Sequence, residues 1–174
     1  LEGINWAGVF ELPILFVCED NQYSASTKTS DMTSGNVADR ARAIGLPVTE
    51  IDGNDVEEIA SVSAEIIARI RATGKPEFML AKTYRLDGHT YFDPATYRPE
   101  GEADRMRRES DPVARQRELL QEAGVAEADL DAVRMTAASE MQAALDAAKA
   151  APWPADDTVF NDVQDVGSPA QEAF

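Results

Sequence analysis

The chain has 174 residues and a formal net charge of −16, which argues against nucleic acid or an anionic membrane surface as a partner. Its length suits a domain with a sizeable core, and no apolar run is long enough to span a bilayer. The single cysteine, Cys18, excludes an intrachain disulfide and is typical of a reducing compartment. Together with four lysines against twelve arginines, this favours a cytoplasmic protein of a bacterium or archaeon.

The first third of the chain predicts a helix, a strand and a loop. A short helical pattern runs from Glu2 to Phe10 and stops before Pro13. The apolar run Ile14 to Cys18 does not alternate with polar residues, which predicts a strand buried on both faces. Residues 21–34 are polar and rich in Ser and Thr, so we expect an irregular loop there, either a mobile flap or a plain connection.

The middle of the chain predicts two capped helices around a second strand. Asn36 is a helix cap, and that helix ends near Ile44 at a glycine. A brief strand follows over residues 48–51, then a turn in which Asn54 or Asp55 caps the next helix, residues 56–72. Three- and four-residue spacing predicts that one face of this helix covers the sheet; that face comprises Val56, Ile59, Ala60, Ser63, Ile66, Ile67 and Ile70.

A third strand follows Pro76 and reaches Arg85, and residues 87–110 have loop chemistry. Helical pieces are expected over residues 111–123, 127–133 and 135–150, followed by a proline-punctuated tail. The predicted fold class is therefore α/β, a parallel sheet flanked by helices and followed by a helical C-terminal region. The predicted domains are residues 1–110, a helical extension over 111–150, and an extended or disordered tail over 151–174.

Polar side chains follow two of the predicted strands. Asn21 and Tyr23 come after the first strand, and the only histidine, His89, comes after the third. Because open α/β sheets bind ligands at the carboxyl ends of their strands, a cofactor site is expected there. By pattern alone an Asx-turn at Asn21 and a solvated loop position for His89 are favoured over a ligand and a catalytic residue. A pair between Asp93 and Arg85 would order the His89 loop by a charge-assisted bond or remain an ordinary surface pair.

Several motifs together resemble one family. They are Asn5, Leu12-Pro13-Ile14, the block Val17 to Tyr23, the phrase Val48 to Val56, Thr83-Tyr84-Arg85, Gly88-His89, Asp93-Pro94, Tyr97-Arg98 and Ser110-Asp111-Pro112. In this order they resemble the carboxyl-terminal half of the alpha subunit of the thiamine-diphosphate-dependent 2-oxo acid dehydrogenases, which include pyruvate, branched-chain 2-oxo acid and acetoin dehydrogenases. The resemblance implies part of a thiamine-diphosphate-binding fold.

Three positions depart from the family pattern. The Gly-Asp-Gly segment, whose aspartate is a metal ligand in the family, is absent upstream of Asn21. The usual Asn-Asn pair reads Asp20-Asn21, which keeps the ligand position. Asp87 stands where many members have a basic residue or a second histidine.

The resemblance also implies roles for individual residues. Asn21 would bind Mg²⁺ through its amide oxygen and Tyr23 through its backbone carbonyl, because Mg²⁺ prefers oxygen ligands. His89 would be the catalytic residue beside the thiazolium ring, where an imidazole gives and takes protons near neutrality. Arg85 is expected among the residues that line the cofactor. Thr90 occupies the position of a regulatory phosphoserine in animal relatives, and a plain loop hydroxyl is the alternative.

The implied reaction is decarboxylation of a 2-oxo acid on thiamine diphosphate and Mg²⁺, with transfer of the acyl group to lipoyl. The implied partners are a beta subunit in an α₂β₂ heterotetramer, a lipoyl-bearing acyltransferase, and the missing N-terminal half of the alpha subunit. Two alternatives are an acetoin dehydrogenase and a split or truncated fragment that serves assembly without catalysis. A transketolase half would fit the strand ends but not the Gly-His-(x)3-Asp-Pro loop.

Overall fold

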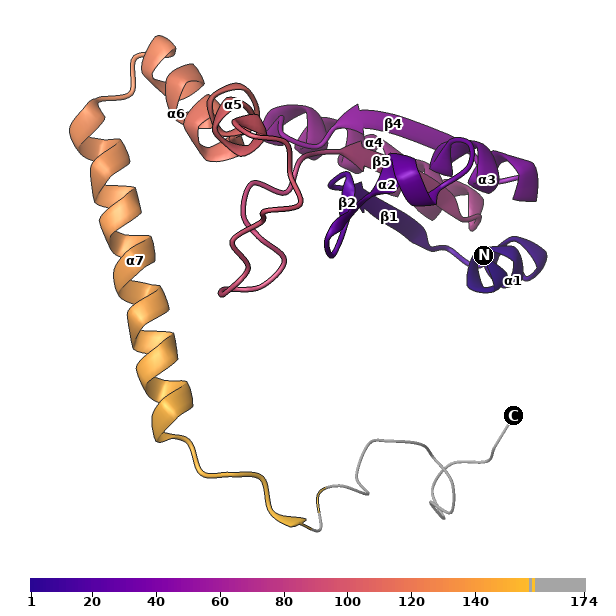
Figure 1. The fold of residues 1–174 in the computed structure, drawn as a ribbon. Helices are drawn as coiled ribbons and strands as arrows, with labels where there is room; N and C mark the ends of the chain where they lie inside the picture. Colours follow the sequence, from indigo (N-terminus) through magenta and orange to yellow (C-terminus); the bar gives the residue numbers. More distant parts are fainter. Residues whose placement is uncertain (157, 159–174) are drawn as a thin grey trace. The chain divides into compact units, whose positions relative to one another are not determined.

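The computed structural model describes residues 1–156 and 158, and the chain divides into two compact units with the boundary after Val125. The first unit, residues 1–125, holds every strand among the described residues and most of the helices (Figure 1). Its centre is a parallel sheet with helices packed against it, so the predicted α/β class is confirmed.

The sheet has three parallel strands in the order β1-β5-β4, with β1 at Leu15–Asp20, β5 at Glu77–Lys82 and β4 at Val48–Asp52. The central strand β5 is buried along nearly its whole length. The prediction that the first strand is buried on both faces is wrong. β1 lies at the edge of this sheet, only partly covered, and Val17 on it is 51% exposed.

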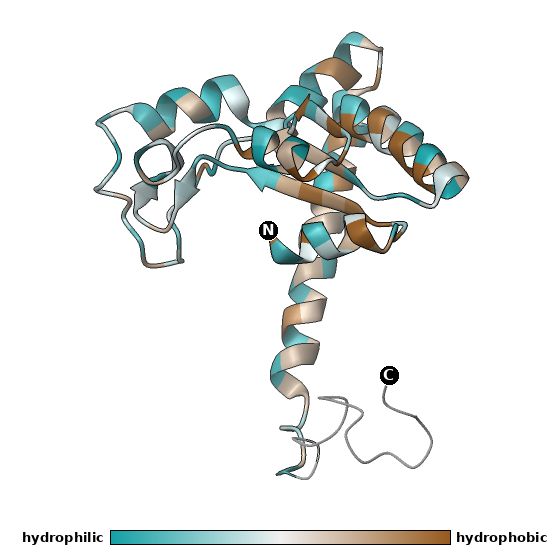
Figure 2. Cartoon of the chain, turned by 90° about the vertical axis from the view of Figure 1, so that its right-hand side faces the viewer, coloured by the Kyte–Doolittle hydropathy of each residue, from teal (hydrophilic) through white to brown (hydrophobic). Residues whose placement is uncertain are grey.

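Each face of the sheet packs against its own helices. Alternate residues of β5 point to opposite faces, as strand geometry requires. Phe78 and Leu80 join a cluster with helix α3 (Val37–Ile44) and helix α1 (Glu2–Val9), while Met79 and Ala81 join a cluster with helix α4 (Val56–Thr73). Figure 2 shows the apolar residues on the strands and on the helices beside them.

The two predicted helix caps form as expected. The Asn36 side chain accepts a hydrogen bond from the backbone N–H of Ala38, and that of Asp55 accepts from those of Glu57 and Glu58. On α4 the buried face runs through Ile66 and Ile70, with Ile59, Val62 and Ser63 partly buried. Val56, Ala60 and Ile67 were expected on this face and are exposed instead, because the buried stripe of α4 is narrower than the periodicity implied.

Residues 21–34 are more regular than the prediction of an irregular loop. A short antiparallel hairpin joins β2 (Tyr23–Ser24) to β3 (Thr27–Lys28), and the helical turn α2 (Thr29–Met32) follows. The hairpin closes through Ala25, which adopts a positive φ of 49°. A polar segment therefore forms a small defined structure directly after β1.

Residues 87–110 are only partly the loop that was predicted. Helix α5 (Glu102–Ser110) occupies the second half of this segment, and α6 (Pro112–Glu122) follows. The sequence did not predict α5, because this segment is mostly charged and carries few apolar residues to show a helical period. Asp111 caps α6, and proline at the first helical position suits a helix start.

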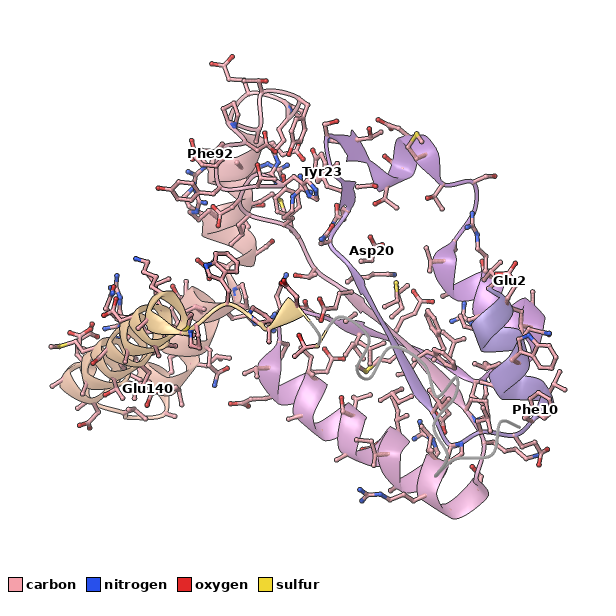
Figure 3. All side chains as sticks on the ribbon, turned by 90° about the horizontal axis from the view of Figure 1, so that it is seen from below. Glu2, Phe10, Asp20, Tyr23, Phe92 and Glu140 are labelled. Atoms are coloured by element: carbon pink, nitrogen blue, oxygen red, sulfur yellow. The ribbon has the colours of Figure 1, made fainter. Side chains whose placement is uncertain are left out.

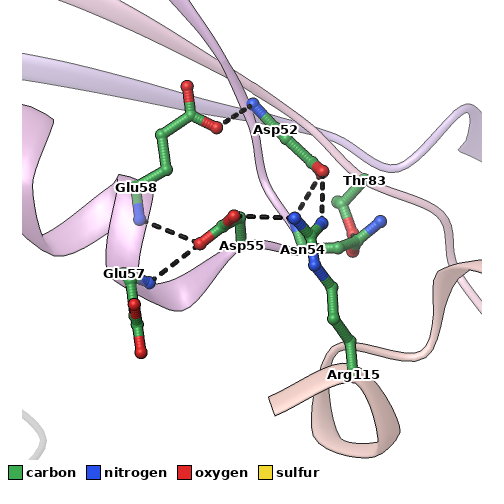
Figure 4. Close-up of polar contacts among 7 residues, drawn as sticks. All are labelled: Asp52, Asn54, Asp55, Glu57, Glu58, Thr83 and Arg115. Atoms are coloured by element: carbon green, nitrogen blue, oxygen red, sulfur yellow. Dashed lines mark hydrogen bonds and ion pairs between the residues drawn. The ribbon is translucent and has the colours of Figure 1, made fainter. Parts of the chain in front are cut away.

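An arginine on α6 anchors this helix to the turn after β4. Arg115 contacts Asp52 at 2.5 Å and Asp55 at 2.7 Å, one through each terminal nitrogen (Figure 4). Asn54 lies in the same turn, and its side-chain oxygen accepts a hydrogen bond of 2.5 Å from the hydroxyl of Thr83, which follows β5. The turn after β4 is thereby fixed to the end of β5 and to α6.

The second unit begins at Ala126, and its described part is mainly helix α7 (Glu127–Ala150). Two helices were expected here, with a break near residue 134, but the helix is continuous because no glycine or proline interrupts it. Of the tail predicted over 151–174, residues 157 and 159–174 lie outside the described residues. Within the described part of the chain no helix is long and apolar enough to cross a bilayer.

Candidate functional site

The predicted metal ligands lie in a tight turn at the carboxyl end of β1. The side-chain oxygen of Asn21 accepts a hydrogen bond of 3.1 Å from the backbone N–H of Tyr23, which is the Asx-turn weighed as the simpler interpretation. Gln22 between them has a φ of +68°. Its side chain donates to the backbone carbonyl of Thr83 at 3.0 Å, which ties the turn to the end of β5. Figure 3 shows Tyr23 beyond the strand end marked by Asp20.

The side chain of Tyr23 is buried in a polar cluster. Its hydroxyl donates to Oε1 of Glu102 at 2.9 Å, and the Tyr84 hydroxyl donates to the same oxygen at 3.1 Å. The ammonium group of Lys28 contacts Oε2 of Glu102 at 3.0 Å. The two tyrosine rings meet edge to face with centroids 6.0 Å apart. One carboxylate therefore joins the hairpin, the end of β5 and the start of α5.

The ionisation of this cluster follows from its burial and hydrogen bonds. Burial and the hydrogen bond to Glu102 raise the pKa of Tyr84 to about 12, and the same two causes raise the pKa of Tyr23. Burial opposes ionisation of Glu102, but hydrogen bonds from Lys28 and the two tyrosines outweigh it, so the Glu102 pKa is lowered. The cluster therefore holds neutral phenols and an ionised carboxylate at neutral pH.

One arginine from further along the chain holds the segment that leads to His89. Arg98 is buried, and its terminal nitrogens donate to the backbone carbonyls of Arg85, Leu86 and Asp87 at 2.6 to 2.8 Å. Its guanidinium group also lies 5.0 Å from the centroid of the Tyr23 ring. Its Nε is buried without a hydrogen-bond partner. The side chain of Arg98, which follows His89 in the sequence, therefore fixes the backbone that precedes His89.

The His89 loop is closed on itself by Asp93. The backbone N–H of His89 donates to Oδ2 of Asp93 at 2.7 Å, and the Tyr97 hydroxyl donates to the same oxygen at 2.7 Å. Arg85 donates to the Tyr97 hydroxyl at 2.6 Å. The expected bond between Asp93 and Arg85 is therefore indirect and runs through Tyr97. Hydrogen bonds from the His89 N–H, the Tyr97 hydroxyl and the Ala95 N–H lower the pKa of Asp93 to about 2.

The imidazole of His89 is exposed in this chain. It borders an open recess of about 480 Å³ that the loop itself lines, with Asp87, Gly88, Thr90, Tyr91 and Asp93. Tyr91 and Phe92 beside it are 95% and 86% exposed, and Figure 3 marks Phe92 on the loop. A second recess of about 470 Å³ opens beside the turn at residues 21–23 and is lined in part by Gln22, Tyr23, Lys28, Lys82 and Glu102.

The structure joins the predicted site residues by a short path. The backbone N–H of Arg85 donates to the carbonyl of Asn21 at 3.2 Å, because β1 and β5 are parallel neighbours that end together at Asp20 and Lys82. From Arg85 the path continues through Tyr97 and Asp93 to His89. Asn21, Tyr23 and Arg85 thus lie together, and His89 is linked to them through the loop.

Sequence reasoning did not predict a role for Glu102 or Tyr84. Glu102 was placed in a loop, and nothing in the linear sequence indicates that a carboxylate at the start of a charged helix faces two tyrosines from other segments. Tyr97 and Arg98 were noted only as part of a motif. The pairing of a tyrosine and an arginine shortly after an Asp-Pro step was the available signal.

Comparison with known proteins decides the family. Residues 1–156 match the family described as dehydrogenase E1 component. The chain belongs to this family. It is 35% identical over 165 residues to the alpha subunit of acetoin:2,6-dichlorophenolindophenol oxidoreductase from Cupriavidus necator, covering 94% of this chain and 50% of that protein.

Two further relatives have names that refer to other compounds, pyruvate and 3-methyl-2-oxobutanoate. The alpha subunit of the pyruvate dehydrogenase E1 component from Zymomonas mobilis is 31% identical, with 93% of this chain and 46% of that protein covered. The 3-methyl-2-oxobutanoate dehydrogenase alpha subunit from Mycobacterium tuberculosis is 40% identical, with 71% and 34% covered. The chain spans at most about half the length of these relatives. The resemblance predicted from the motifs is confirmed.

Proposed function

We propose that this chain is the carboxyl-terminal part of the alpha subunit of a thiamine-diphosphate-dependent dehydrogenase. In this proposal the complete enzyme decarboxylates a 2-oxo acid of the pyruvate type and passes the acyl group to a lipoyl group. The observation that carries the proposal is the path from the Asn21–Tyr23 turn through Arg85 to the His89 loop. The membership of the dehydrogenase E1 family supports it.

The residues at the turn fit a magnesium ion. Asn21 offers an amide oxygen and Tyr23 a backbone carbonyl oxygen, and oxygen donors are what Mg²⁺ selects. The hydrogen bond from the Tyr23 N–H occupies one lone pair of the Asn21 oxygen and leaves the other for a metal. Within residues 1–156 and 158, no cluster of three or more His, Cys, Asp or Glu side chains could hold a metal. Further ligands would therefore come from the diphosphate, from water and from another segment.

His89 is proposed as the acid–base residue and Arg85 as the residue that connects it to the cofactor end of the site. Thiamine diphosphate, when bound, supplies the nucleophilic carbon that decarboxylation of a 2-oxo acid requires. His89 would hold or release a proton at its imidazole during that reaction. Its exposure in this chain suits a residue that faces a bound group rather than a packed core.

The proposed partners are a beta subunit in an α₂β₂ heterotetramer, a lipoyl-bearing acyltransferase, and the N-terminal half of the alpha subunit. Exposed apolar side chains on β1 and at α1 support the proposal of the N-terminal half. Val17 on the edge strand is exposed, and so are the stacked rings of Trp6 and Phe10, 5.1 Å apart. Apolar surface of this kind is stabilised when another segment covers it. We also propose a cytoplasmic location, which suits the free thiol of Cys18.

Acetoin is a second candidate substrate. It is favoured by the 35% identity to the acetoin:2,6-dichlorophenolindophenol oxidoreductase subunit over nearly the whole chain. Parallel assays of the assembled enzyme with pyruvate, 3-methyl-2-oxobutanoate and acetoin separate these candidates. Activity with none of them, in an assembly that binds the cofactor, would instead support a non-catalytic assembly fragment.

The test of the proposed function is the variant Asn21→Ala in the complete subunit assembled with its partner. It should abolish Mg²⁺-dependent binding of thiamine diphosphate, measured by calorimetry, while the melting temperature stays near that of the wild type. Asn5→Ala is the matched control, because Asn5 is exposed on α1 and should leave cofactor binding unchanged. Unchanged cofactor affinity in Asn21→Ala would overturn the metal assignment.

A further inference from the structure

Glu102 has an unusually complete set of partners for a carboxylate near the surface. It is the first residue of α5, and its side chain is only 11% exposed. Oε1 accepts hydrogen bonds from the hydroxyls of Tyr23 and Tyr84 at 2.9 and 3.1 Å, and Oε2 contacts the Lys28 ammonium group at 3.0 Å. The four residues come from three segments, the β2–β3 hairpin, the end of β5 and the start of α5, and the carboxylate is the point where those segments join.

The side chain of Tyr23 is fixed at its ring as well as at its hydroxyl. The charged groups of Arg98, Arg85 and Lys28 lie 5.0, 5.4 and 5.9 Å from its ring centroid. The edge-to-face contact with Tyr84 limits rotation of the ring further. Among these contacts, the hydrogen bond from the Tyr23 hydroxyl to Glu102 is the most directional, so it fixes the outer end of the ring.

The fixed ring constrains the position of the Tyr23 backbone. The ring and the carbonyl group share one Cα atom, and the Tyr23 N–H is already bonded to the side-chain oxygen of Asn21. A shift of the ring that rotation about the side-chain bonds does not absorb would displace the Tyr23 backbone, and with it the two oxygens that the proposed metal site needs. Gln22 fixes the turn from the other side through its bond to the Thr83 carbonyl.

We propose that Glu102 is a positioning residue for the metal-binding turn, and that it acts through the Tyr23 hydroxyl. The inference rests on the proposed function, because it takes Asn21 and Tyr23 as metal ligands. Glu102 itself does not bind the metal, since its two oxygens already accept three donors within the chain. Residues that support metal ligands in this way commonly change metal affinity by about 10- to 100-fold when they are replaced.

The test measures Mg²⁺ affinity in the presence of thiamine diphosphate, by calorimetry on the complete subunit assembled with its partner. The variants are Glu102→Gln, Tyr23→Phe and the double variant. Glu102→Gln keeps the shape of the side chain but removes its charge, and Tyr23→Phe keeps the ring but removes the hydroxyl. Each single variant should weaken Mg²⁺ binding about tenfold. The double variant should be little weaker than either single one, because Glu102→Gln weakens and Tyr23→Phe removes the same hydrogen bond.

Glu100→Gln is the matched control, because Glu100 is an exposed glutamate two residues away and should leave Mg²⁺ affinity unchanged. If Glu102→Gln binds Mg²⁺ as the wild type does, while Asn21→Ala loses it, the role of Glu102 is overturned and the proposed function stands. Additive losses in the double variant also overturn it. If Glu102→Gln fails to fold, Tyr23→Phe decides alone, and unchanged affinity there rejects the inference. Retained Mg²⁺ binding in Asn21→Ala would instead reject the proposed function.

Discussion

The carboxylate of Asp93 accepts the backbone N–H of His89 at 2.7 Å, which closes the loop on which the proposed catalytic residue lies. The same oxygen accepts the Tyr97 hydroxyl, and the other oxygen accepts the N–H of Ala95 at 2.8 Å. Asp93 therefore fixes the backbone of His89 without touching its imidazole. This separation of the anchor from the reacting group makes the two experimentally distinguishable.

Replacing Asp93 should loosen the loop and leave the fold intact. Asp93→Ala removes three acceptor contacts, so turnover of the assembled enzyme should fall by roughly tenfold to a hundredfold, as misplacement of a catalytic group does. Limited proteolysis should cut the loop faster, while the melting temperature changes little. Asp104→Ala, at an exposed position of α5, is the control and should behave as the wild type does. Wild-type turnover in Asp93→Ala would contradict the anchoring role.

The loop should lose its anchor in acid. The pKa of Asp93 is lowered from 3.8 to about 2 by hydrogen bonds that favour its charged form. A lowered pKa means that the contribution of Asp93 is fully present above about pH 4 and is lost as the pH falls through about 2. Carboxyl chemical shifts in a nuclear magnetic resonance titration should show this. In Tyr97→Phe the Asp93 pKa should rise, because one of those hydrogen bonds is gone. A value near 3.8 in the wild type would refute the bonding pattern.

Gly88 offers a test that changes no charge. A Cβ atom there would overlap the carbonyl oxygen of Asp93 and lie 2.8 Å from its Cβ. Gly88→Ala should therefore displace the loop and lower turnover by roughly tenfold or more. Gly3→Ala is the control, because nothing lies within 4 Å of a Cβ added at Gly3. Equal turnover in both variants would show that the loop tolerates a side chain at Gly88.

His89→Ala should affect turnover and leave cofactor binding unchanged. Loss of a positioned acid–base group lowers the rate by roughly a hundredfold or more. Affinity for thiamine diphosphate should change little, since the lost interaction belongs mainly to the transition state. The melting temperature should also hold, because the side chain is exposed. Rates and cofactor titrations on one preparation test both halves, with Glu100→Ala as the control. If turnover falls only because cofactor is lost, His89 is not the acid–base residue.

The 174-residue chain alone should bind thiamine diphosphate weakly or not at all. Its turn supplies one side-chain oxygen and one backbone oxygen, too few to hold Mg²⁺ and a diphosphate firmly. Calorimetry of the purified chain with Mg²⁺ and thiamine diphosphate measures this, with the assembled enzyme as the positive control. Binding in the micromolar range by the chain alone would show that the site is misplaced.

The α/β class and the position of the proposed site along the chain follow from the sequence alone. Apolar runs ending in polar residues identify β1 and β5, and local signals such as Asn36, Asp55 and the glycines after α3 and α4 set helix ends. These features depend on neighbouring residues, so they can be read locally. The motifs from Asn21 to His89 identified the family for the same reason, since their order and spacing are properties of the chain.

The contacts between residues from distant segments are visible in the folded chain and have no signal in the sequence. Glu102 joins Tyr23, Lys28 and Tyr84 from distant segments, and Arg98 binds three carbonyls on the way to His89. The order β1-β5-β4 likewise placed the first strand at an edge, which no run of apolar residues reveals. Such contacts depend on how parallel strands and their loops pack in space, and a carboxylate or guanidinium has the same linear signature whether it is solvated or buried among partners.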